Sequence, residues 1–330
     1  MTKPHTSSRS ILVTGASGQL GPYVVRRLSA DGHRVTAWSS GGGGVKAKRW
    51  PRSEGSPAFH PVGPGRASFF GLPLRPVDLA SPGQVAVAFR EAAPDVVVHL
   101  AAISSVSEAY QNPDSAAAVN TVGTQRLAEF CAQHGSRLIY VSTDLVFDGE
   151  HAPYREEDAP KPLSVYGATK LAGEAAVLGT PQGLVLRLSL LFGPSLSGGT
   201  TFFDQQVAAL RERRPIRLFK DEWRTPLALP AAADAIAAAL GSQHTGRLHL
   251  GGPERLSRYE MGCLLAERLG ADASVLIPTS RLEAAGEPRP RDTSLDSSRW
   301  RVAFPHVSPS GYYESIESLL NETTGPPRRP

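Results

Sequence analysis

The stretch Val13-Thr14-Gly15-Ala16-Ser17-Gly18-Gln19-Leu20-Gly21 decides the fold of this chain. It follows a short apolar segment, 11–14, that is typical of a β-strand, and it leads into a helical pattern over 19–30. Glycines at these positions permit a tight turn, a close approach of the backbone to a pyrophosphate, and close packing of the helix on the strand. A strand, a glycine turn and a helix in this order predict a dinucleotide-binding unit with the phosphates at the helix N-terminus.

Strands and helices continue to alternate through the N-terminal part of the chain. Apolar strands are expected at 11–14, 34–38, 74–77, 95–100, 137–142 and 183–189, and helices at 19–30, 81–93, 114–134 and 164–178. Strands separated by helices predict an α/β fold with a Rossmann-like, doubly wound parallel sheet. The glycine- and proline-rich segment 39–73 is expected to be a loop inserted into this sheet, either a surface excursion or a lid over the cofactor.

The pattern loosens after residue 194. Helices are expected at 202–213, 231–240 and 257–269, and short strands at 247–250 and 274–277. These elements predict a smaller C-terminal substrate-binding lobe, mainly 195–321, over the carboxyl ends of the sheet formed by 10–194, where open α/β sheets bind ligands. Residues 1–9 and 322–330 are expected to be flexible tails.

Composition and charge exclude several classes of protein. The 330 residues are 41% hydrophobic, and the +4 net charge is dispersed without the basic helix or stripe typical of nucleic-acid binding. No apolar run approaches the ~20 residues of a membrane span, and the polar N-terminus lacks a signal-peptide core, so a cytoplasmic location is expected. Cys131 and Cys263 are expected to be buried free thiols, with no disulfide and no metal site.

A second group of residues carries candidate chemistry. Tyr166 and Lys170 are spaced i, i+4 and share one helix face. A lysine ammonium beside a phenol lowers the tyrosine pKa, and such a tyrosine can exchange a proton with an alcohol or a ketone near neutral pH. The hydroxyl of Thr143, at the end of the preceding strand, could hold the same oxygen. Together with the glycine turn, these residues predict hydride transfer on a carbonyl group.

The glycine turn, Thr143-Asp144 and Tyr166-Gly167-Ala168-Thr169-Lys170 together resemble the extended short-chain dehydrogenase/reductase family, over nearly the whole chain. The resemblance implies that Tyr166 is the acid/base, that Thr143 polarises the carbonyl, that Lys170 holds the ribose and lowers the Tyr166 pKa, and that Asp144 belongs to the catalytic set. It implies cofactor contacts for Gly15, Ser17, Gly18, Gln19, Leu20, Ser39, Ser40, Asp78, Leu79, Ala101, Ala102, Tyr166, Lys170 and Arg187.

Five residues are interpreted further. Asp78-Leu79 is either the family's adenine contact or a simple strand-end turn, and Arg187 either lies near the nicotinamide or forms a salt bridge. Asn120 resembles a family position that supports the active-site backbone. His99 is interpreted as a packed, hydrogen-bonded core histidine and not as a base.

The end of the second strand sets the choice of cofactor, because an acidic residue there binds the ribose 2′-hydroxyl and repels a 2′-phosphate. The run 38–40, Trp-Ser-Ser, contains no acid. Lys46, Lys48 or Arg49 could reach a 2′-phosphate if the loop folds back. The sequence therefore favours NADP(H) over NAD(H).

The run 142–149, Ser-Thr-Asp-Leu-Val-Phe-Asp-Gly, narrows the resemblance to the reductases of 4-keto sugar nucleotides typified by dTDP-4-dehydrorhamnose reductase. The family's dehydratases place a glutamate after the Thr-Asp pair, whereas this chain has Leu145, where the reductases normally have tyrosine. The runs 153–158 and 289–296 also resemble this subfamily. The acidic residues 156–158 are interpreted as a solvated loop and not as a magnesium site.

This resemblance implies an NADP(H)-dependent reductase of a nucleotide-activated 4-keto-6-deoxy sugar. It implies substrate contacts for Ser104, Thr143, Arg224, Arg289 and Arg291. The arginines could bind a diphosphate or sugar hydroxyls bidentately, or they could form ion pairs between the lobes.

Two other functions stay open. The same motifs resemble the regulatory β subunit of methionine adenosyltransferase, which has the reductase fold but serves as a nucleotide-binding partner. An NAD-dependent epimerase or dehydrogenase acting on another sugar nucleotide is the second alternative. A homodimer through helices beside 164–178 is a further option, with Leu171, Ala175 and Val177 either exposed to a partner or buried within the chain.

Overall fold

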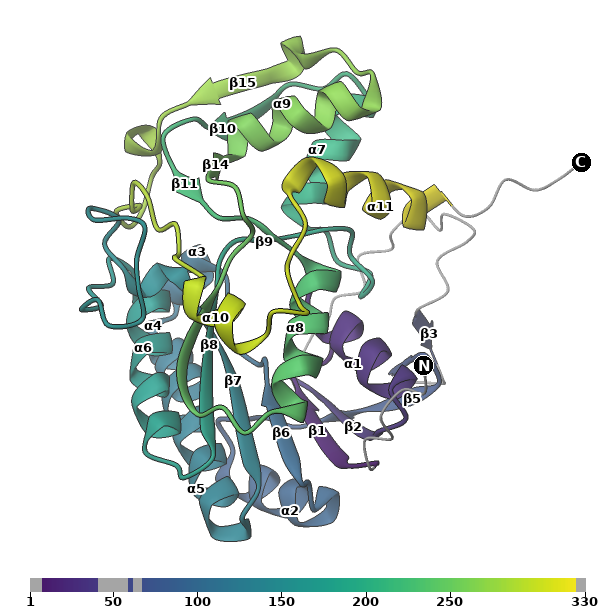
Figure 1. The fold of residues 1–330 in the computed structure, drawn as a ribbon, viewed down its shortest axis with the longest axis vertical. Helices are drawn as coiled ribbons and strands as arrows, with labels where there is room; N and C mark the ends of the chain where they lie inside the picture. The colour runs from purple at the N-terminus through teal and green to yellow at the C-terminus, as the bar shows by residue number, and fades with distance from the viewer. Residues whose placement is uncertain (1–7, 41–58, 62–66, 325–330) are drawn as a thin grey trace, which may run out of the picture.

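The computed structural model describes residues 8–40, 59–61 and 67–324, and its centre is a nine-stranded sheet (Figure 1). Seven strands run parallel in the order β13-β8-β7-β6-β1-β2-β5. Their bounds are β1 (Ser10–Thr14), β2 (Arg34–Ser39), β5 (Leu72–Pro76), β6 (Val96–His99), β7 (Arg137–Thr143), β8 (Gly183–Leu188) and β13 (Gly246–Leu250). This order is that of a doubly wound Rossmann-like sheet, so the predicted fold class is confirmed.

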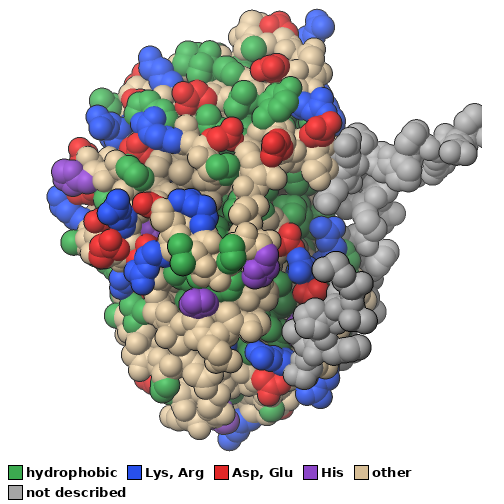
Figure 2. Space-filling view, in the orientation of Figure 1, with side chains coloured by type: hydrophobic (Ala, Val, Ile, Leu, Met, Phe, Trp, Pro, Cys, Tyr) green, Lys and Arg blue, Asp and Glu red, His purple; other side chains and the backbone are tan. Residues whose placement is uncertain are grey.

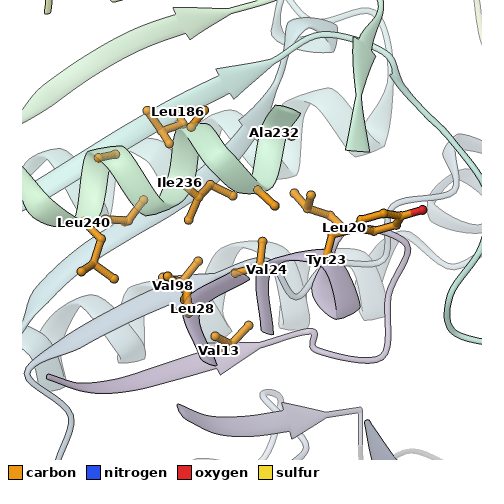
Figure 3. Close-up of a cluster of buried hydrophobic side chains, with 14 of the residues drawn as sticks. Val13, Leu20, Tyr23, Val24, Leu28, Val98, Leu186, Ala232, Ile236 and Leu240 are labelled. Atoms are coloured by element: carbon orange, nitrogen blue, oxygen red, sulfur yellow. The ribbon is translucent and has the colours of Figure 1, made fainter. Parts of the chain in front are cut away.

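Helices cover both faces of the sheet because successive strand residues point to opposite sides. Leu12 belongs to a core with the helices α2 (Pro82–Ala92), α5 (Thr124–His134) and α6 (Val165–Leu178). Val13 belongs to the opposite core, with α1 (Gly21–Ala30) and α8 (Leu229–Gly241). Figure 3 shows this second core, where side chains from α1 and α8 meet those of the strands; labelled are Val13, Leu20, Tyr23, Val24, Leu28, Val98, Leu186, Ala232, Ile236 and Leu240.

Two elements that the sequence assigned to the C-terminal lobe lie in the Rossmann layer instead. The expected helix 231–240 is α8, which packs on α1 through Ile236. The expected strand 247–250 is β13, which pairs in parallel with β8 along the edge of the main sheet. Both elements are apolar on the side that the sheet can cover, and burial there outweighs their distance along the chain.

The lobe lies at the top of Figure 1 and holds a third apolar core. It contains α7 (Phe202–Arg211), α9 (Arg258–Leu269), α11 (Tyr312–Thr324), β10 (Ile216–Phe219) and β15 (Leu276–Thr279). Short pairs of strands connect it to the sheet domain: β9 (Leu191–Phe192) with β12 (Leu227–Ala228), and β11 (Trp223–Arg224) with β14 (Leu256–Ser257). The short helix α10 (Ser298–Ala303) returns to the sheet domain, where Trp300 is buried.

Two stretches differ from their predicted secondary structure. Within the expected loop 39–73, β3 (Phe59–Pro61) and β4 (Ala67–Phe69) extend the sheet from β5 as antiparallel strands. Residues 41–58 and 62–66 of that loop, including Lys46, Lys48 and Arg49, lie outside the described residues. The single helix expected at 114–134 is divided into α4 (Pro113–Ala116), a π-helical segment (η1, Ala117–Gly123) and α5, and α3 (Val106–Gln111) precedes them.

The sequence also predicts how charge is distributed and whether the cysteines are buried. On the face drawn in Figure 2, basic and acidic side chains are interspersed. None of the helices in the described ranges is long and apolar enough to cross a membrane. Cys131 is buried as expected, whereas Cys263 is only half-buried, and both are free thiols. Val177 is buried in the core, so this residue does not offer the surface considered for a dimer.

Candidate functional site

The glycine turn between β1 and α1 is shaped to receive a phosphate group. Gly15 has a φ of +66°, and a Cβ there would lie 2.6 Å from the backbone nitrogen of Ala101, so the turn and the end of β6 touch. The helix α1 starts after Leu20, whose side chain makes no capping hydrogen bond. Gly18 and Gln19 are exposed. A close backbone and a helix N-terminus without a side-chain cap are the features that dinucleotide phosphates use.

The other predicted cofactor residues surround this turn. Ser39 ends β2 beside it, where the Ala16 nitrogen donates to the Trp38 carbonyl at 2.9 Å, and Ser40 is exposed. Asp78 Oδ1 accepts from the Ala80 nitrogen at 2.9 Å, so its side chain makes the strand-end turn that was the alternative interpretation. Half-buried and exposed residues follow β6 at the same edge, and they are Ala101, Ala102 and Ser104.

Thr143 and Tyr166 meet at the carboxyl end of β7. Thr143 is the last residue of β7, and its side chain lies near enough to the phenol of Tyr166, in the first turn of α6, to lower the pKa of that phenol. Burial raises the pKa of Tyr166 to about 12, with Asp144 adding to the shift while Thr143 and Arg224 oppose it. The phenol is therefore protonated at neutral pH, which is the form that can donate a proton.

Lys170 lies one turn further along α6 and is buried. Its ammonium donates to the Val141 carbonyl at 2.7 Å and lies 4.0 Å from the centroid of the Tyr140 ring. Burial lowers the pKa of Lys170 to about 7, against the opposing effect of Glu174. The net shift in the pKa of Tyr166 is thus opposite to the expected one, because burial outweighs any effect of this lysine.

Two buried polar residues beneath the site match their interpretations. Asn120, in the π-helical segment, accepts from the Ile103 nitrogen at 2.8 Å and donates to Thr169 Oγ1 at 3.0 Å, which ties the end of β6 to the catalytic helix. Its π-helical placement is a common feature of functional sites. His99 is fully buried between Thr14 and Thr124, at 2.7 and 2.9 Å, and burial lowers its pKa to about 3. It is a core histidine, as predicted.

Arg187 forms a buried salt bridge and does not line the site. Its Nε and Nη2 donate to the two carboxylate oxygens of Glu174 at 2.9 and 2.7 Å, and both side chains are at most 1% exposed. Ser142 Oγ donates to the same carboxylate at 2.6 Å. The implied contact of Arg187 with the nicotinamide is therefore wrong, and its alternative interpretation as a salt bridge holds.

A second ion network joins the catalytic residues to the lobe. Asp144 accepts from Arg224 Nη1 at 2.9 Å and from Ser189 Oγ at 3.0 Å. Arg224 Nη2 donates to Glu222 at 2.9 Å, and Glu222 also accepts from Arg289 Nε at 2.6 Å. Burial alone would raise the pKa of Glu222, but Arg224, Arg289 and Arg258 lower it to about 2.

These contacts correct the predicted substrate residues. Arg224 is buried, and both of its terminal nitrogens are bound to carboxylates, so it forms the interlobe ion pairs that were the alternative to substrate binding. Arg289 is bound to the same glutamate but stays half-exposed. Arg291 is exposed, and its carbonyl accepts from the Trp223 nitrogen at 2.8 Å.

The runs 142–149, 153–158 and 289–296, which carry the family resemblance, lie together in the fold. The Tyr154 hydroxyl donates to Asp148 at 2.6 Å, and the Tyr154 nitrogen donates to the Ser294 carbonyl at 2.8 Å. A Cβ on Gly149 would lie 2.6 Å from the Arg291 nitrogen. Glu156 is buried and accepts from the His249 nitrogen at 2.8 Å, so the interpretation of 156–158 as a solvated loop is wrong for this residue.

Sequence reasoning missed three residues around Asp144. They are Ser189, Glu222 and Arg258, and each comes from a different segment of the chain. The one available signal was the run 221–224, Asp-Glu-Trp-Arg, which places an acid two residues from an arginine. No spacing rule connects these residues to Thr143, because the fold alone brings them there.

Comparison with known proteins places these features among a set of relatives. The model of the family described as "RmlD substrate binding domain" matches residues 9–324. The subunit beta of methionine adenosyltransferase 2 from Bos taurus is 32% identical over 304 residues, covering 88% of this chain and 81% of that protein. The dTDP-4-dehydrorhamnose reductase of Streptomyces griseus is 32% identical over 301 residues, covering 88% and 87%.

A solved structure with the same fold is the dTDP-4-dehydrorhamnose reductase of Bacillus anthracis in complex with NADP. It superposes with a TM-score of 0.79 at 22% identity and covers 96% of this chain and 100% of its own. At that level of identity the likeness shows the fold.

Proposed function

The chain belongs to the RmlD substrate binding domain family, and from this premise we propose that it is an NADP(H)-dependent reductase of a nucleotide-activated 4-keto-6-deoxy sugar. The prediction of an NAD(P)-dependent oxidoreductase of the dTDP-4-dehydrorhamnose reductase type is confirmed at the level of the family. The observation that carries the finer proposal is the placement of Thr143 at the end of β7 beside Tyr166 in the first turn of α6, with Lys170 one turn away.

The residues of the glycine turn fit a dinucleotide, because Gly15 leaves no room for a Cβ and α1 begins without a side-chain cap. When bound, a nicotinamide cofactor supplies the hydride. Tyr166, protonated at neutral pH, would then donate its proton to the carbonyl oxygen of the sugar. Thr143 would hold the same oxygen and polarise the carbonyl. Asp144 fixes the direction of this strand end, since Arg224 and Ser189 both bind its carboxylate.

Two observations support NADP(H) as the preferred cofactor. The end of β2 carries Ser39 and Ser40, neither of which repels a 2′-phosphate. In addition, the structure of the Bacillus anthracis relative contains NADP. A structure of WbmG from Bordetella bronchiseptica, with a TM-score of 0.78 at 22% identity, contains NAD and UDP, so the fold alone does not separate the two cofactors.

The test is oxidation of NADPH in the presence of a dTDP-4-keto-6-deoxy sugar, followed by absorbance. We expect turnover by the wild type, with NADPH preferred to NADH, and a loss of about 10²- to 10⁴-fold in kcat for Tyr166→Phe. Tyr313→Phe is the matched control, because Tyr313 is 40% exposed and lies on α11 in the C-terminal lobe. Wild-type protein that binds NADPH but reduces no 4-keto sugar would refute the proposal.

A regulatory nucleotide-binding role is the second candidate, and the similarity to subunit beta of methionine adenosyltransferase 2 supports it. Under this hypothesis the chain forms a stable complex with a methionine adenosyltransferase catalytic subunit. Size-exclusion chromatography of the mixed proteins measures this directly. In that case Tyr166→Phe leaves the complex intact, because a binding partner does not need the phenol proton.

A further inference from the structure

Three arginines stand around Glu222 at the junction of the lobe and the sheet domain, and they differ in what they bind. Arg224 and Arg289 donate to carboxylates, as described above. Arg258 is the exception. Within the described ranges, no carboxylate or carbonyl accepts a hydrogen bond from its guanidinium, although this side chain is half-buried.

The backbone fixes Arg258 beside the catalytic network. β14 pairs with β11 in an antiparallel register that sets Ser257 opposite Trp223, and Arg258 is the next residue and the first of α9. Its guanidinium carbon lies 4.6 Å from the centroid of the Phe202 ring, which holds the planar group in place. The arginine is therefore positioned, although it lacks an acceptor.

The charges around Arg258 leave room for an anion. Glu222 and Asp144 attract its guanidinium, Arg224 and Arg289 repel it, and burial is the largest effect that lowers its pKa, to about 10. Two carboxylates face three guanidinium groups, which leaves a formal excess of one positive charge. Withdrawing a cation from water without giving it an acceptor is costly, so the site is incomplete as it stands.

We propose that Arg258 binds the diphosphate of the nucleotide-activated substrate, which is one of the roles that the family resemblance implied for Arg224. A guanidinium presents paired N–H donors that match two phosphate oxygens, and the excess charge at the network complements the anion. Arg224 instead fixes Asp144, and through it the strand end that carries Thr143. This inference rests on the proposed function, because it takes the substrate to be a nucleoside diphosphate sugar.

Neighbouring arginines are less suited to this role. Arg255 is bound to Asp292 and stacks on Trp223, with its guanidinium carbon 4.3 Å from the ring centroid. Arg291 is exposed, so an ion bound to it would be screened by water. Only Arg258 combines partial burial, a fixed guanidinium plane and the lack of an acceptor among the described residues around this junction.

The experiment is isothermal titration calorimetry of the full chain with dTDP and with UDP, beside steady-state kinetics on the keto sugar. We expect Arg258→Gln to weaken nucleoside diphosphate binding and raise KM by about 10- to 100-fold, with kcat changed much less. Arg258→Lys should keep part of the affinity, because it keeps the charge. Arg268→Gln is the matched control on the same helix, where the arginine is paired with Glu317 on the surface.

Calorimetry, kinetics and the melting temperature together distinguish a loss of binding from a loss of folding. They also distinguish failure of this inference from failure of the proposed function. NADPH affinity and the melting temperature should be unchanged in Arg258→Gln, whereas a purely structural arginine would lower both. An Arg258→Gln protein that keeps wild-type KM and dTDP affinity overturns the inference and leaves the reductase in place. Wild-type binding of dTDP that depends on Arg258, without any turnover, supports the site and removes the reductase. A wild type that binds neither nucleotide overturns both.

Discussion

The buried pair of Glu174 and Arg187 offers the most quantitative test of the physical reasoning. Both side chains are at most 1% exposed, and two hydrogen bonds of 2.7 and 2.9 Å join them beneath the catalytic helix. Replacing Arg187 by methionine removes the partner and leaves the carboxylate of Glu174 in the core. Ser142 at 2.6 Å and Arg247, whose Nε lies 3.5 Å away, are the remaining groups that stabilise it.

Breaking a buried ion pair on one side costs about 3–5 kcal/mol, because an uncompensated charge stays in a medium of low dielectric. The entropy of unfolding of a 330-residue chain is about 0.7 kcal/mol per degree, so Arg187→Met should lower the melting temperature by about 4–7 °C. The double variant Glu174→Leu/Arg187→Met removes both charges. It should be destabilised by less than the sum of the two single variants, with a coupling of about 2–3 kcal/mol.

The stability lost in Arg187→Met should depend on pH. In Arg187→Met the carboxylate of Glu174 is a buried charge without its partner, and acid relieves this cost by protonating it. The variant's deficit relative to wild type should therefore shrink as the pH falls from 8 to 5. Urea unfolding followed by tryptophan fluorescence measures this. A loss below about 1 kcal/mol, or a deficit that grows at pH 5, would refute the reasoning.

Three further outcomes follow from the same structure. Gly15→Ala should lose NADPH binding and be destabilised by about 1–3 kcal/mol. Gly32→Ala, where φ is also positive but the space around the residue is open, should bind NADPH normally. Unaltered NADPH binding by Gly15→Ala would contradict the assignment of the glycine turn as the phosphate site. Burial lowers the pKa of His99 and of His249 to about 3 in the folded protein. The free energy of unfolding should therefore fall below pH 6.5, by up to about 1.4 kcal/mol per pH unit for each histidine. Glutamine at either position should reduce this slope, measured by urea unfolding at several pH values. Because the pKa of Lys170 is lowered to about 7, stability should rise between pH 7 and 10, and Lys170→Met should abolish the rise; a rise that persists in the variant assigns it to another group.

The sequence predicts the sheet domain well because the information there is local. A glycine turn, alternating strands and helices, and the spacing of Tyr166 and Lys170 are all readable within short windows. The predicted position of an element is wrong where tertiary contacts determine which layer buries it. The helix 231–240 offers one apolar face and no indication of which layer buries it, and the sheet domain rather than the lobe does so.

Charged residues show this limit of sequence-based prediction most clearly. Arg187, Arg224 and Arg258 look alike in the sequence, yet the first is locked to Glu174, the second to Asp144 and Glu222, and the third has no acceptor among the described residues. Glu174 lies 13 residues from Arg187 and Asp144 lies 80 residues from Arg224, whereas Glu222 is only two residues from Arg224. Since the role of an arginine depends on the carboxylate that reaches it, residue type and local spacing do not separate substrate ligands from structural ion pairs.

The two candidate functions make different demands on residues that both retain. A protein that only binds a dinucleotide can use Lys170 for the ribose and the glycine turn for the phosphates, so both residues are compatible with a regulatory subunit. The phenol proton of Tyr166 is needed only for chemistry at a carbonyl. Burial keeps that proton on the phenol by raising its pKa, and a binding role draws no benefit from this arrangement. Tyr166→Phe therefore separates the functions: it removes turnover from a reductase and leaves a regulatory subunit unchanged.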